Sequence, residues 1–172
     1  KILYQEKLGY GHALIEGINS IKTEYFCIIN ADGSMNPSEL KNMLSKIQDN
    51  NYDVIFGSRY MKNAGSEDDD LITLIGNYFF TRMGNVFFKL RISDILYTYV
   101  LGKTKLVKKL NLTYGDFKIC VELPIKTHKN NHSYISTPSF ERKRIAGKKK
   151  VSPFSDGLKI LFAMINLFFK KN

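Results

Sequence analysis

One carboxylate stands where an apolar segment of the sequence ends. Asp32 follows the run EYFCII at residues 24–29, and Ser34 comes two residues later in the stretch NADGS. Carboxylate and hydroxyl oxygens are ligands that hard divalent cations accept. An Asp-Gly pair after a strand is also a common turn, and the tetrapeptide ADGS by itself favours the turn. Both interpretations stay open at this point.

Basic side chains are the second feature that could do chemistry. Arg59 follows another apolar run, at residues 52–58, and could clamp a phosphate or form a surface ion pair. Other basic residues gather between 141 and 150, namely Arg142, Arg144, Lys148 and Lys150. The formal net charge of +10 suits a partner that carries phosphate, such as a nucleotide, a nucleic acid or an anionic lipid. A run of charges is nevertheless often only a solvated face.

The first third of the chain alternates predicted helices and strands. Helical spacing of apolar residues predicts a helix over 11–20, and the continuous apolar run at 24–29 predicts a buried strand. Asn36 is predicted to cap a second helix, with Pro37 at its first position and Glu39 as capping-box partner.

A second buried strand is predicted at residues 52–58. The order helix, strand, helix, strand predicts an α/β fold with a parallel sheet and crossover helices. Ligands bind at the carboxyl ends of the strands in such sheets. Asp32 and Arg59 both follow strand ends, so we expect them at the same edge of the sheet.

An acidic stretch and a long apolar segment follow. Residues 67–70 (EDDD) are predicted to form a solvated, mobile lid, or else a second metal or acceptor contact. Residues 71–90 are nearly long enough to span a membrane, but polar residues interrupt them. We expect a helix that is buried on most sides or lies on a membrane surface.

The remaining segments are predicted from shorter patterns: a turn, a strand and a short helix at 93–110, a helix at 116–129 bent by Pro124, an edge strand at 132–140, and an apolar helix at 155–172. The last helix is too short to cross a bilayer. It could lie in the membrane interface, held by lysines at its end.

Six stretches occur in this order: GYGHALIEGI, INADGSMNP, VIFGSRY, ISDILYTYVLGKTKL, CVEL and RIAGKKKVSPFSDGLKIL. Together they resemble glycosyltransferase family 2, and especially its polyprenyl-phosphate branch, which is similar to dolichol-phosphate mannose synthase. The resemblance implies a Rossmann-like GT-A fold, with a mixed, mostly parallel sheet flanked by helices. It implies a catalytic domain over 1–154, with the nucleoside-binding strands of the family before Lys1, and a separate amphipathic helix over 155–172.

The resemblance also implies a nucleotide-sugar donor and a divalent metal. The leaving nucleoside diphosphate carries several negative charges, which Mg²⁺ or Mn²⁺ can stabilise. Asp32 stands at the Asp-x-Asp position of the family and, with Ser34, is predicted to hold the metal. Asn30 replaces the first aspartate of that motif. It can hydrogen-bond to a ribose or to Asp32 but brings no charge, so a weaker metal site is expected.

Further donor contacts are expected from glycines and cations. Gly9 and Gly11 would let the backbone approach a phosphate or sugar oxygen at a helix N-terminus, although glycines beside a helix start are also ordinary loop residues. The family position of Arg59 implies a phosphate or sugar contact. The basic loop 142–150 is expected to close over a diphosphate or a lipid phosphate.

The acceptor implied by the resemblance is a polyprenyl phosphate or a glycan. A sugar hydroxyl needs a carboxylate to remove its proton, and the candidates are Asp94, expected to open a strand, and Glu122, among apolar neighbours. A polyprenyl phosphate is already anionic and needs no strong base. Asp94 would then only orient the sugar or an arginine. Either acid could also be a structural cap or an ion-pair member.

The resulting hypothesis is an inverting, metal-dependent glycosyltransferase at the cytoplasmic face of a membrane. Cys27 and Cys120 lie in apolar stretches and favour free thiols in a reducing compartment. The alternative is a non-catalytic membrane-surface or scaffolding domain of the same fold, which Asn30 favours. Nucleic-acid binding is the least favoured, because no nucleic-acid motif is present and residues 67–70 are acidic.

Overall fold

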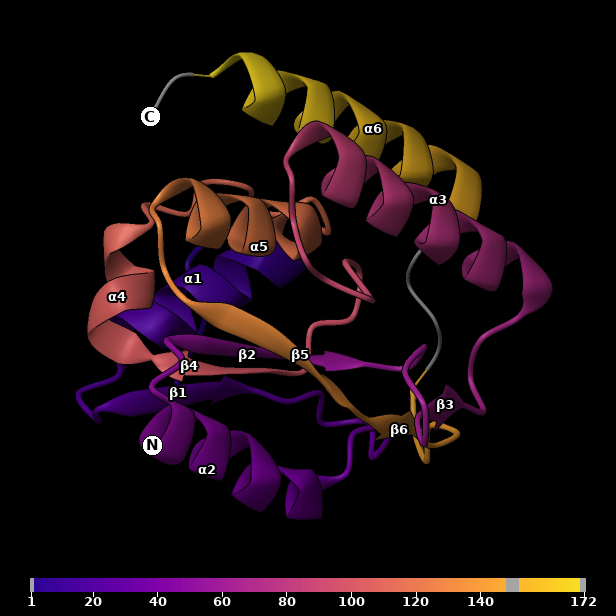
Figure 1. Cartoon of the computed structure of the whole chain (residues 1–172). Helices are drawn as coiled ribbons and strands as arrows, with labels where there is room; N and C mark the ends of the chain where they lie inside the picture. Colours follow the sequence, from indigo (N-terminus) through magenta and orange to yellow (C-terminus); the bar gives the residue numbers. More distant parts are fainter. Residues whose placement is uncertain (1, 148–151, 171–172) are drawn as a thin grey trace.

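Four strands form a mixed sheet in the computed structural model, which describes residues 2–147 and 152–170 (Figure 1). They are β1 (Tyr25–Ile28), β2 (Val54–Ser58), β4 (Val100–Lys103) and β5 (Tyr134–Pro138), in the order β1-β4-β2-β5. Strand β4 is antiparallel to both of its neighbours, whereas β2 and β5 are parallel. A short parallel ladder joins β3 (Gly65–Ser66) to β6 (Phe140–Glu141).

This arrangement confirms the mixed α/β fold and changes one detail of it. Strands β1 and β2 are not neighbours, because β4 pairs between them. Ile28 and Phe56 both lie opposite Val100, so β1 and β2 run in the same direction and end at the same edge. The segments that carry Asp32 and Arg59 therefore leave the sheet at one edge, as predicted.

Helices cover both faces of the sheet. Helix α2 (Leu40–Asn50) lies below it in Figure 1, and α1 (Tyr10–Ser20), α4 (Thr104–Lys109) and α5 (Ile119–Lys129) lie above. Alternating side chains of β2 supply both cores: Val54 and Phe56 enter the core under α1 and α5, and Ile55 enters the core against α2.

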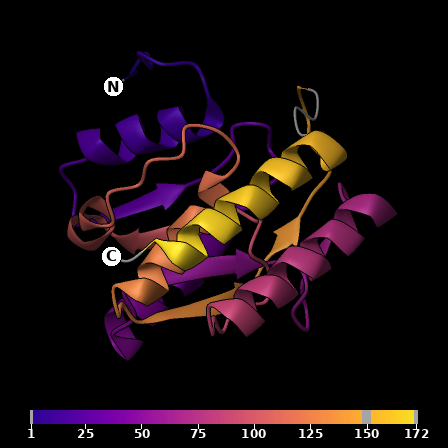
Figure 2. The same cartoon turned by 90° about the horizontal axis from the view of Figure 1, so that it is seen from above.

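Helices α3 (Leu71–Phe87) and α6 (Pro153–Phe169) form an outer layer over α5. They lie side by side in both views (Figures 1 and 2). The inner side of α6 buries Ile160 and Met164 in the main core. The boundary predicted between residues 154 and 155 therefore falls in the first turn of a helix that packs on the domain.

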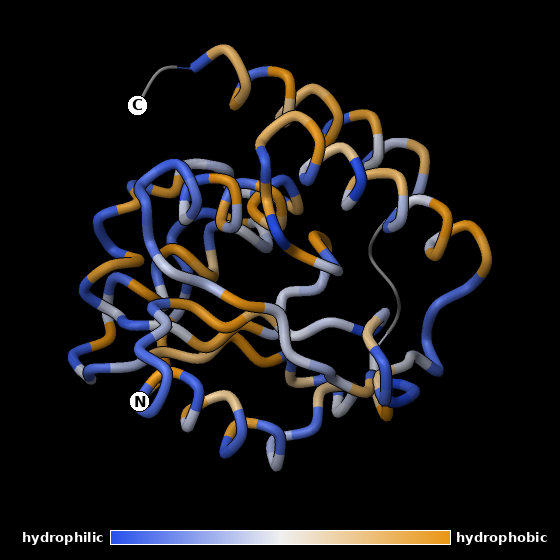
Figure 3. The backbone as a smooth tube through the Cα atoms, viewed as in Figure 1, coloured by the Kyte–Doolittle hydropathy of each residue, from blue (hydrophilic) through white to orange (hydrophobic). Residues whose placement is uncertain are grey.

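Of the two alternatives predicted for the apolar segment 71–90, burial on most sides is contradicted, and a helix on a membrane surface stays a prediction. Helix α3 buries only a narrow stripe, namely Asn77, Phe80, Thr81 and Gly84. The exposed apolar side chains of α3 and α6 form what we call the outer apolar face, and Figure 3 shows the apolar residues of both helices as orange segments of the tube. Its exposed members are Leu71, Ile72, Leu74, Ile75, Tyr78, Phe79, Val86 and Phe87 on α3, and Phe154, Leu158, Phe162, Ile165, Phe168 and Phe169 on α6. Among the described residues, none of the helices is long and apolar enough to cross a membrane.

The start of the second predicted helix is confirmed at Asn36, but not its capping box. The Asn36 side chain accepts a hydrogen bond from the Ser38 amide and opens a short 3-10 turn, η1 (Pro37–Glu39). Glu39 does not reach back to Asn36. Its Oε1 accepts from the Phe140 amide instead and ties this turn to β6.

Candidate functional site

A cavity of about 850 Å³ lies at the edge of the sheet where β1 and β2 end. Part of its lining is charged and comes from loops and from β6: Asp32, Arg59, Asp68, Asp69, Glu141 and Arg144. Another part is apolar and comes from α3 and α6. It includes the buried Phe80 and Ile160, and four members of the outer apolar face, which therefore borders the cavity: Ile72, Ile75, Phe79 and Phe154. Four carboxylates face two arginines in the charged part, so the described lining carries an excess of negative charge.

Asp32 lies in the turn after β1, and the turn places its carboxylate in the cavity. Its Oδ1 accepts a hydrogen bond from the Ser34 amide at 3.0 Å, and its Oδ2 lies 3.9 Å from Nη1 of Arg144. The two interpretations of ADGS are therefore compatible, since a turn presents the acid. The Ser34 hydroxyl is buried without a partner among the described residues and does not line the cavity. It stays a secondary candidate ligand.

The segment that follows β6 is docked on this turn. The Arg142 amide donates to the Ser34 carbonyl, and the Ile145 amide donates to the Asp32 carbonyl. The Arg142 side chain is exposed and donates to the carbonyl of Met35, which lines the cavity, but Arg142 itself is not part of the described lining. Lys148 and Lys150 lie outside the described residues.

Arg144 closes one side of the charged part. Its guanidinium makes two hydrogen bonds to Asp68, Nε to Oδ1 at 3.2 Å and Nη2 to Oδ2 at 2.6 Å. The hydrogen bonds to Asp68, with the nearby charges of Asp68 and Asp32, raise the pKa of Arg144. The acidic stretch is thus tied down at Asp68, and the prediction of a solvated, mobile lid is wrong there.

Arg59 is the centre of a buried ionic cluster. Its Nε and Nη2 donate to Asp94, at 2.7 and 3.1 Å, and its Nη1 donates to Asp69 and Glu141, both at 3.1 Å. Burial alone would lower the pKa of Arg59, but the charges and hydrogen bonds of its partners raise it well above the ordinary value. Arg59 lines the cavity, yet all three of its nitrogens are engaged. It is neither the free phosphate clamp nor the surface ion pair expected from the sequence.

Asp94 positions this arginine. It is fully buried in the loop between α3 and β4, not at the start of a strand, and it does not line the cavity. Of the roles left open by the sequence, orienting an arginine agrees with this geometry, and removing a proton from an acceptor does not.

Glu122 has a structural position. Its side chain on α5 is fully buried and accepts hydrogen bonds from the amides of Thr113 and Tyr114 and from the Thr113 hydroxyl. Its Oε1 also lies 2.7 Å from Nζ of Lys126. Because these contacts occupy both oxygens and the residue does not line the cavity, its predicted role as an acceptor base is corrected.

The glycines at the start of α1 approach another backbone segment instead of a ligand. A Cβ at Gly11 would lie 2.1 Å from the carbonyl oxygen of Tyr114, and Gly9 has a φ of 146°, where only glycine is unstrained. The His12 amide donates to the Gly115 carbonyl, which covers the helix N-terminus expected to bind phosphate.

Tyr10, between these glycines, does enter the cavity. Its hydroxyl lies 2.5 Å from Oγ1 of Thr98 and donates to Oδ1 of Asn30 at 3.5 Å, and its ring stacks on Phe117. Asn30 lines the cavity beside Asp32, as its motif position implies.

Sequence reasoning missed Glu141 and Tyr10. The available signal for Glu141 was one acid at the start of a basic run, and for Tyr10 an aromatic residue between two glycines. Neither signal points to a cavity without knowledge of the distant segments that complete it.

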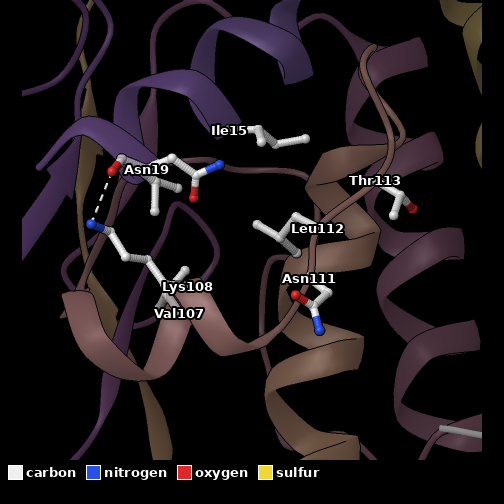
Figure 4. Close-up of a pocket in the computed structure, with 8 residues that line it drawn as sticks. Ile15, Asn19, Val107, Lys108, Asn111, Leu112 and Thr113 are labelled. Carbon is white, nitrogen blue, oxygen red and sulfur yellow. Dashed lines mark hydrogen bonds between the residues drawn. The ribbon is translucent and has the colours of Figure 1, made fainter.

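A smaller hollow of about 200 Å³ lies between α1 and the end of α4 (Figure 4). Its lining includes Ile15, Val107 and Leu112 and contains no carboxylate. The cation at its rim, Lys108, donates to the carbonyls of Asn19 and Ile21 and so caps the end of α1. This hollow offers no groups for catalysis.

The comparisons with known proteins agree with this geometry. The family model described as glycosyl transferase family 2 matches residues 1–111. The chain belongs to this family. This family 2 chain is also similar in structure to solved proteins, and that similarity continues beyond residue 111. Glucosyl-3-phosphoglycerate synthase from Mycobacterium tuberculosis in complex with UDP has a TM-score of 0.69 at 9% identity, over 96% of this chain and 57% of that one.

Two further structures match as well. The same mycobacterial synthase with Mn²⁺, UDP and phosphoglyceric acid has a TM-score of 0.68 at 9% identity, over 96% of this chain and 56% of that one. A mycobacterial protein without a stated activity has a TM-score of 0.70 at 7% identity, over 100% of this chain and 55% of that one. The chain therefore spans less than two thirds of the length of these structures. At such identities the likeness shows a shared fold, which confirms the GT-A prediction.

Proposed function

We propose that this protein transfers a sugar, with inversion, from a nucleotide-diphosphate donor to a polyprenyl-phosphate acceptor at a membrane surface. The observation that carries the proposal is the Asp32 carboxylate, which lines a large cavity at the sheet edge while one of its oxygens accepts a hydrogen bond from the Ser34 amide. Family membership supports the reaction class. The mycobacterial synthase has been solved with UDP-glucose, which supports a nucleotide-sugar donor.

The charge of the cavity supports a divalent metal, Mg²⁺ or Mn²⁺. The described lining has more carboxylates than arginines, and the arginines are already paired, so a diphosphate entering alone would be repelled. Among the described residues, no group of three or more metal-ligating side chains exists. A site with one protein carboxylate, completed by diphosphate oxygens and water, fits that finding.

The residues around the cavity would then have defined roles. The metal, when bound, supplies charge that stabilises the leaving nucleoside diphosphate. Asp32 would hold it, and Asn30 would offer a neutral hydrogen bond beside it. Arg144, which lies 3.9 Å from Asp32, is placed to exchange this contact for a phosphate oxygen. Arg59 holds Asp69 and Glu141 in place through its hydrogen bonds to them.

The cavity lining supports an amphipathic acceptor. Its charged part adjoins apolar side chains of α3 and α6, so a head group and a hydrocarbon chain would each meet a matching surface. Neither acid predicted as a base, Asp94 or Glu122, lines this cavity. An acceptor that is already anionic, such as a polyprenyl phosphate, needs no base, and for this reason we favour it over a glycan.

The outer apolar face supports a membrane surface as its occupant. Phe154, Tyr78 and Phe169 are each more than 70% exposed there, and α3 contains no acidic residue. The net charge of +10 would attract such a face to anionic lipid. A second copy of the chain on this face is the competing outcome, which a concentration-dependent dimer in the absence of vesicles would reveal.

Donor turnover tests the proposed reaction. With a UDP-sugar and Mn²⁺, the variant Asp32→Ala is expected to lose turnover by about 10²-fold or more while its melting temperature stays close to that of the wild type. Asp49→Ala, which removes an exposed carboxylate on α2, is the matched control and should keep full turnover. Turnover that is indifferent to Asp32 or to a chelator would remove this carboxylate from the reaction.

Two observations favour a second function, a non-catalytic domain that binds membranes. Both arginines of the cavity are paired with carboxylates, and Asn30 leaves the motif with a single acid. This alternative predicts binding to anionic vesicles together with a donor that stays intact under all metal conditions.

A further inference from the structure

Asn77 is a polar residue in the inward stripe of α3. It is 1% exposed, and its Oδ1 is buried without a hydrogen-bond partner among the described residues. The residue also lines the large cavity. Buried amides without partners are rare in native proteins because burial removes their hydrogen bonds to water. An unsatisfied amide on a residue that lines a cavity therefore points to a ligand group.

A second asparagine on the same helix shows that the fold can satisfy such a side chain. Asn85 uses both ends of its amide: Nδ2 donates to the Ile92 carbonyl at 2.9 Å, and Oδ1 accepts from the Ile92 amide at 3.2 Å. Thr81, also in the inward stripe, accepts from the Ile95 amide. Asn77 is thus not a typical member of this helix, since its neighbours have structural partners.

The surroundings of Asn77 restrict the ligand it could bind. The helix neighbours that line the cavity with it include Gly76 and Phe80, and Gly157 and Ile160 of α6 line the same cavity. The only arginines of the described lining are Arg59 and Arg144, and carboxylates hold both. Asn77 therefore offers a neutral hydrogen bond next to an apolar surface. This combination fits an amphipathic molecule with an oxygen-bearing head group.

We propose that Asn77 determines acceptor specificity by hydrogen-bonding to a head-group oxygen of an amphipathic acceptor whose apolar chain lies between α3 and α6. The inference rests on the proposed function for its acceptor class. It adds a residue that distinguishes an acceptor with a polar head from a plain hydrocarbon. A site built to hydrogen-bond a ligand rejects an analogue without that group, because the buried amide is then left unpaired.

Binding of two probes to the protein tests the inference without turnover. Farnesyl phosphate carries the head group, and farnesene has a similar chain without it. Asn77→Leu is expected to weaken farnesyl phosphate binding about tenfold and to leave farnesene binding unchanged or tighter, as measured by calorimetric or NMR titration. The melting temperature of this variant should not fall, because no protein hydrogen bond is lost. Mn²⁺-dependent UDP binding should be unchanged.

Asn85→Leu is the matched control. It removes two hydrogen bonds to Ile92, so it should lower the melting temperature and leave the ratio of the two probe affinities unchanged. If Asn77→Leu keeps the wild-type ratio, or melts at a lower temperature, the role of Asn77 is overturned and the proposed function stands. If the wild type binds neither probe, the lipid acceptor and the role of Asn77 are both overturned.

Discussion

Replacing Arg59 should lower the stability of the fold more than replacing its main partner, Asp94. Arg59→Leu leaves Asp94, Asp69 and Glu141 around a site without a cation, and all three are at least nine-tenths buried. Breaking a buried ion pair by removing one partner costs about 3–5 kcal/mol. Asp94→Asn removes one charge but leaves Arg59 with two carboxylates, so we expect a loss of about 2 kcal/mol, the value of a hydrogen bond to a charged group.

Thermal unfolding measures this asymmetry. For a domain of this size, each kcal/mol shifts the melting temperature by about 2–4 °C, so the expected losses are about 6–20 °C for Arg59→Leu and about 4–8 °C for Asp94→Asn. Equal losses for the two variants would refute the assignment of Arg59 as the centre of the cluster.

Three further predictions follow from single contacts. Arg144→Ala removes the cation 3.9 Å from Asp32, so Mn²⁺ alone should bind up to about fivefold more tightly by electron paramagnetic resonance, while donor turnover falls; weaker Mn²⁺ binding would contradict this role. Partial burial raises the pKa of Asp53, but hydrogen bonds from Lys103 and Ser133 outweigh it and hold the pKa below its ordinary value of 3.8. Its contribution is complete above that value and is lost as the pH falls through the folded value, so Asp53→Asn should destabilise the protein at pH 7 and converge with the wild type in acid; a constant difference down to pH 2 would argue against it. Phe162 is 62% exposed on the outer apolar face, so Phe162→Asp should weaken binding to anionic vesicles at least about tenfold in a sedimentation assay without changing the melting temperature. The control is Leu8→Asp, at an exposed position before α1, and an equal loss of binding in that variant would show a non-specific charge effect.

Local patterns predicted the elements and the place of the acid. The end of the apolar run at residue 29 located Asp32, and Asn36 capped its turn, because both signals act over a few residues. The position of β4 between β1 and β2 had no local signal, since pairing joins segments far apart in the sequence. The same holds for Arg59, whose partners Asp94 and Glu141 lie 35 and 82 residues away.

Two site predictions failed for physical reasons that the sequence conceals. Gly11 allows a close backbone approach, as expected, but the approaching group is the Tyr114 carbonyl and not a ligand. Glu122 has apolar neighbours in the sequence, yet the Thr113 and Tyr114 amides satisfy its carboxylate. An acid in an apolar run indicates that the side chain is buried. The pattern does not distinguish a catalytic base from a structural hydrogen-bond acceptor.

Mn²⁺ binding in the presence of UDP tests the central claim most directly, because it isolates the role of Asp32 from turnover and from the acceptor. Electron paramagnetic resonance titration of the wild type should show Mn²⁺ affinity at least about tenfold higher with UDP than without it, since diphosphate oxygens complete the coordination. Asp32→Asn should lose this gain, and Asp49→Asn should keep it. An Asp32→Asn variant that binds Mn²⁺ and UDP as tightly as the wild type would contradict the account.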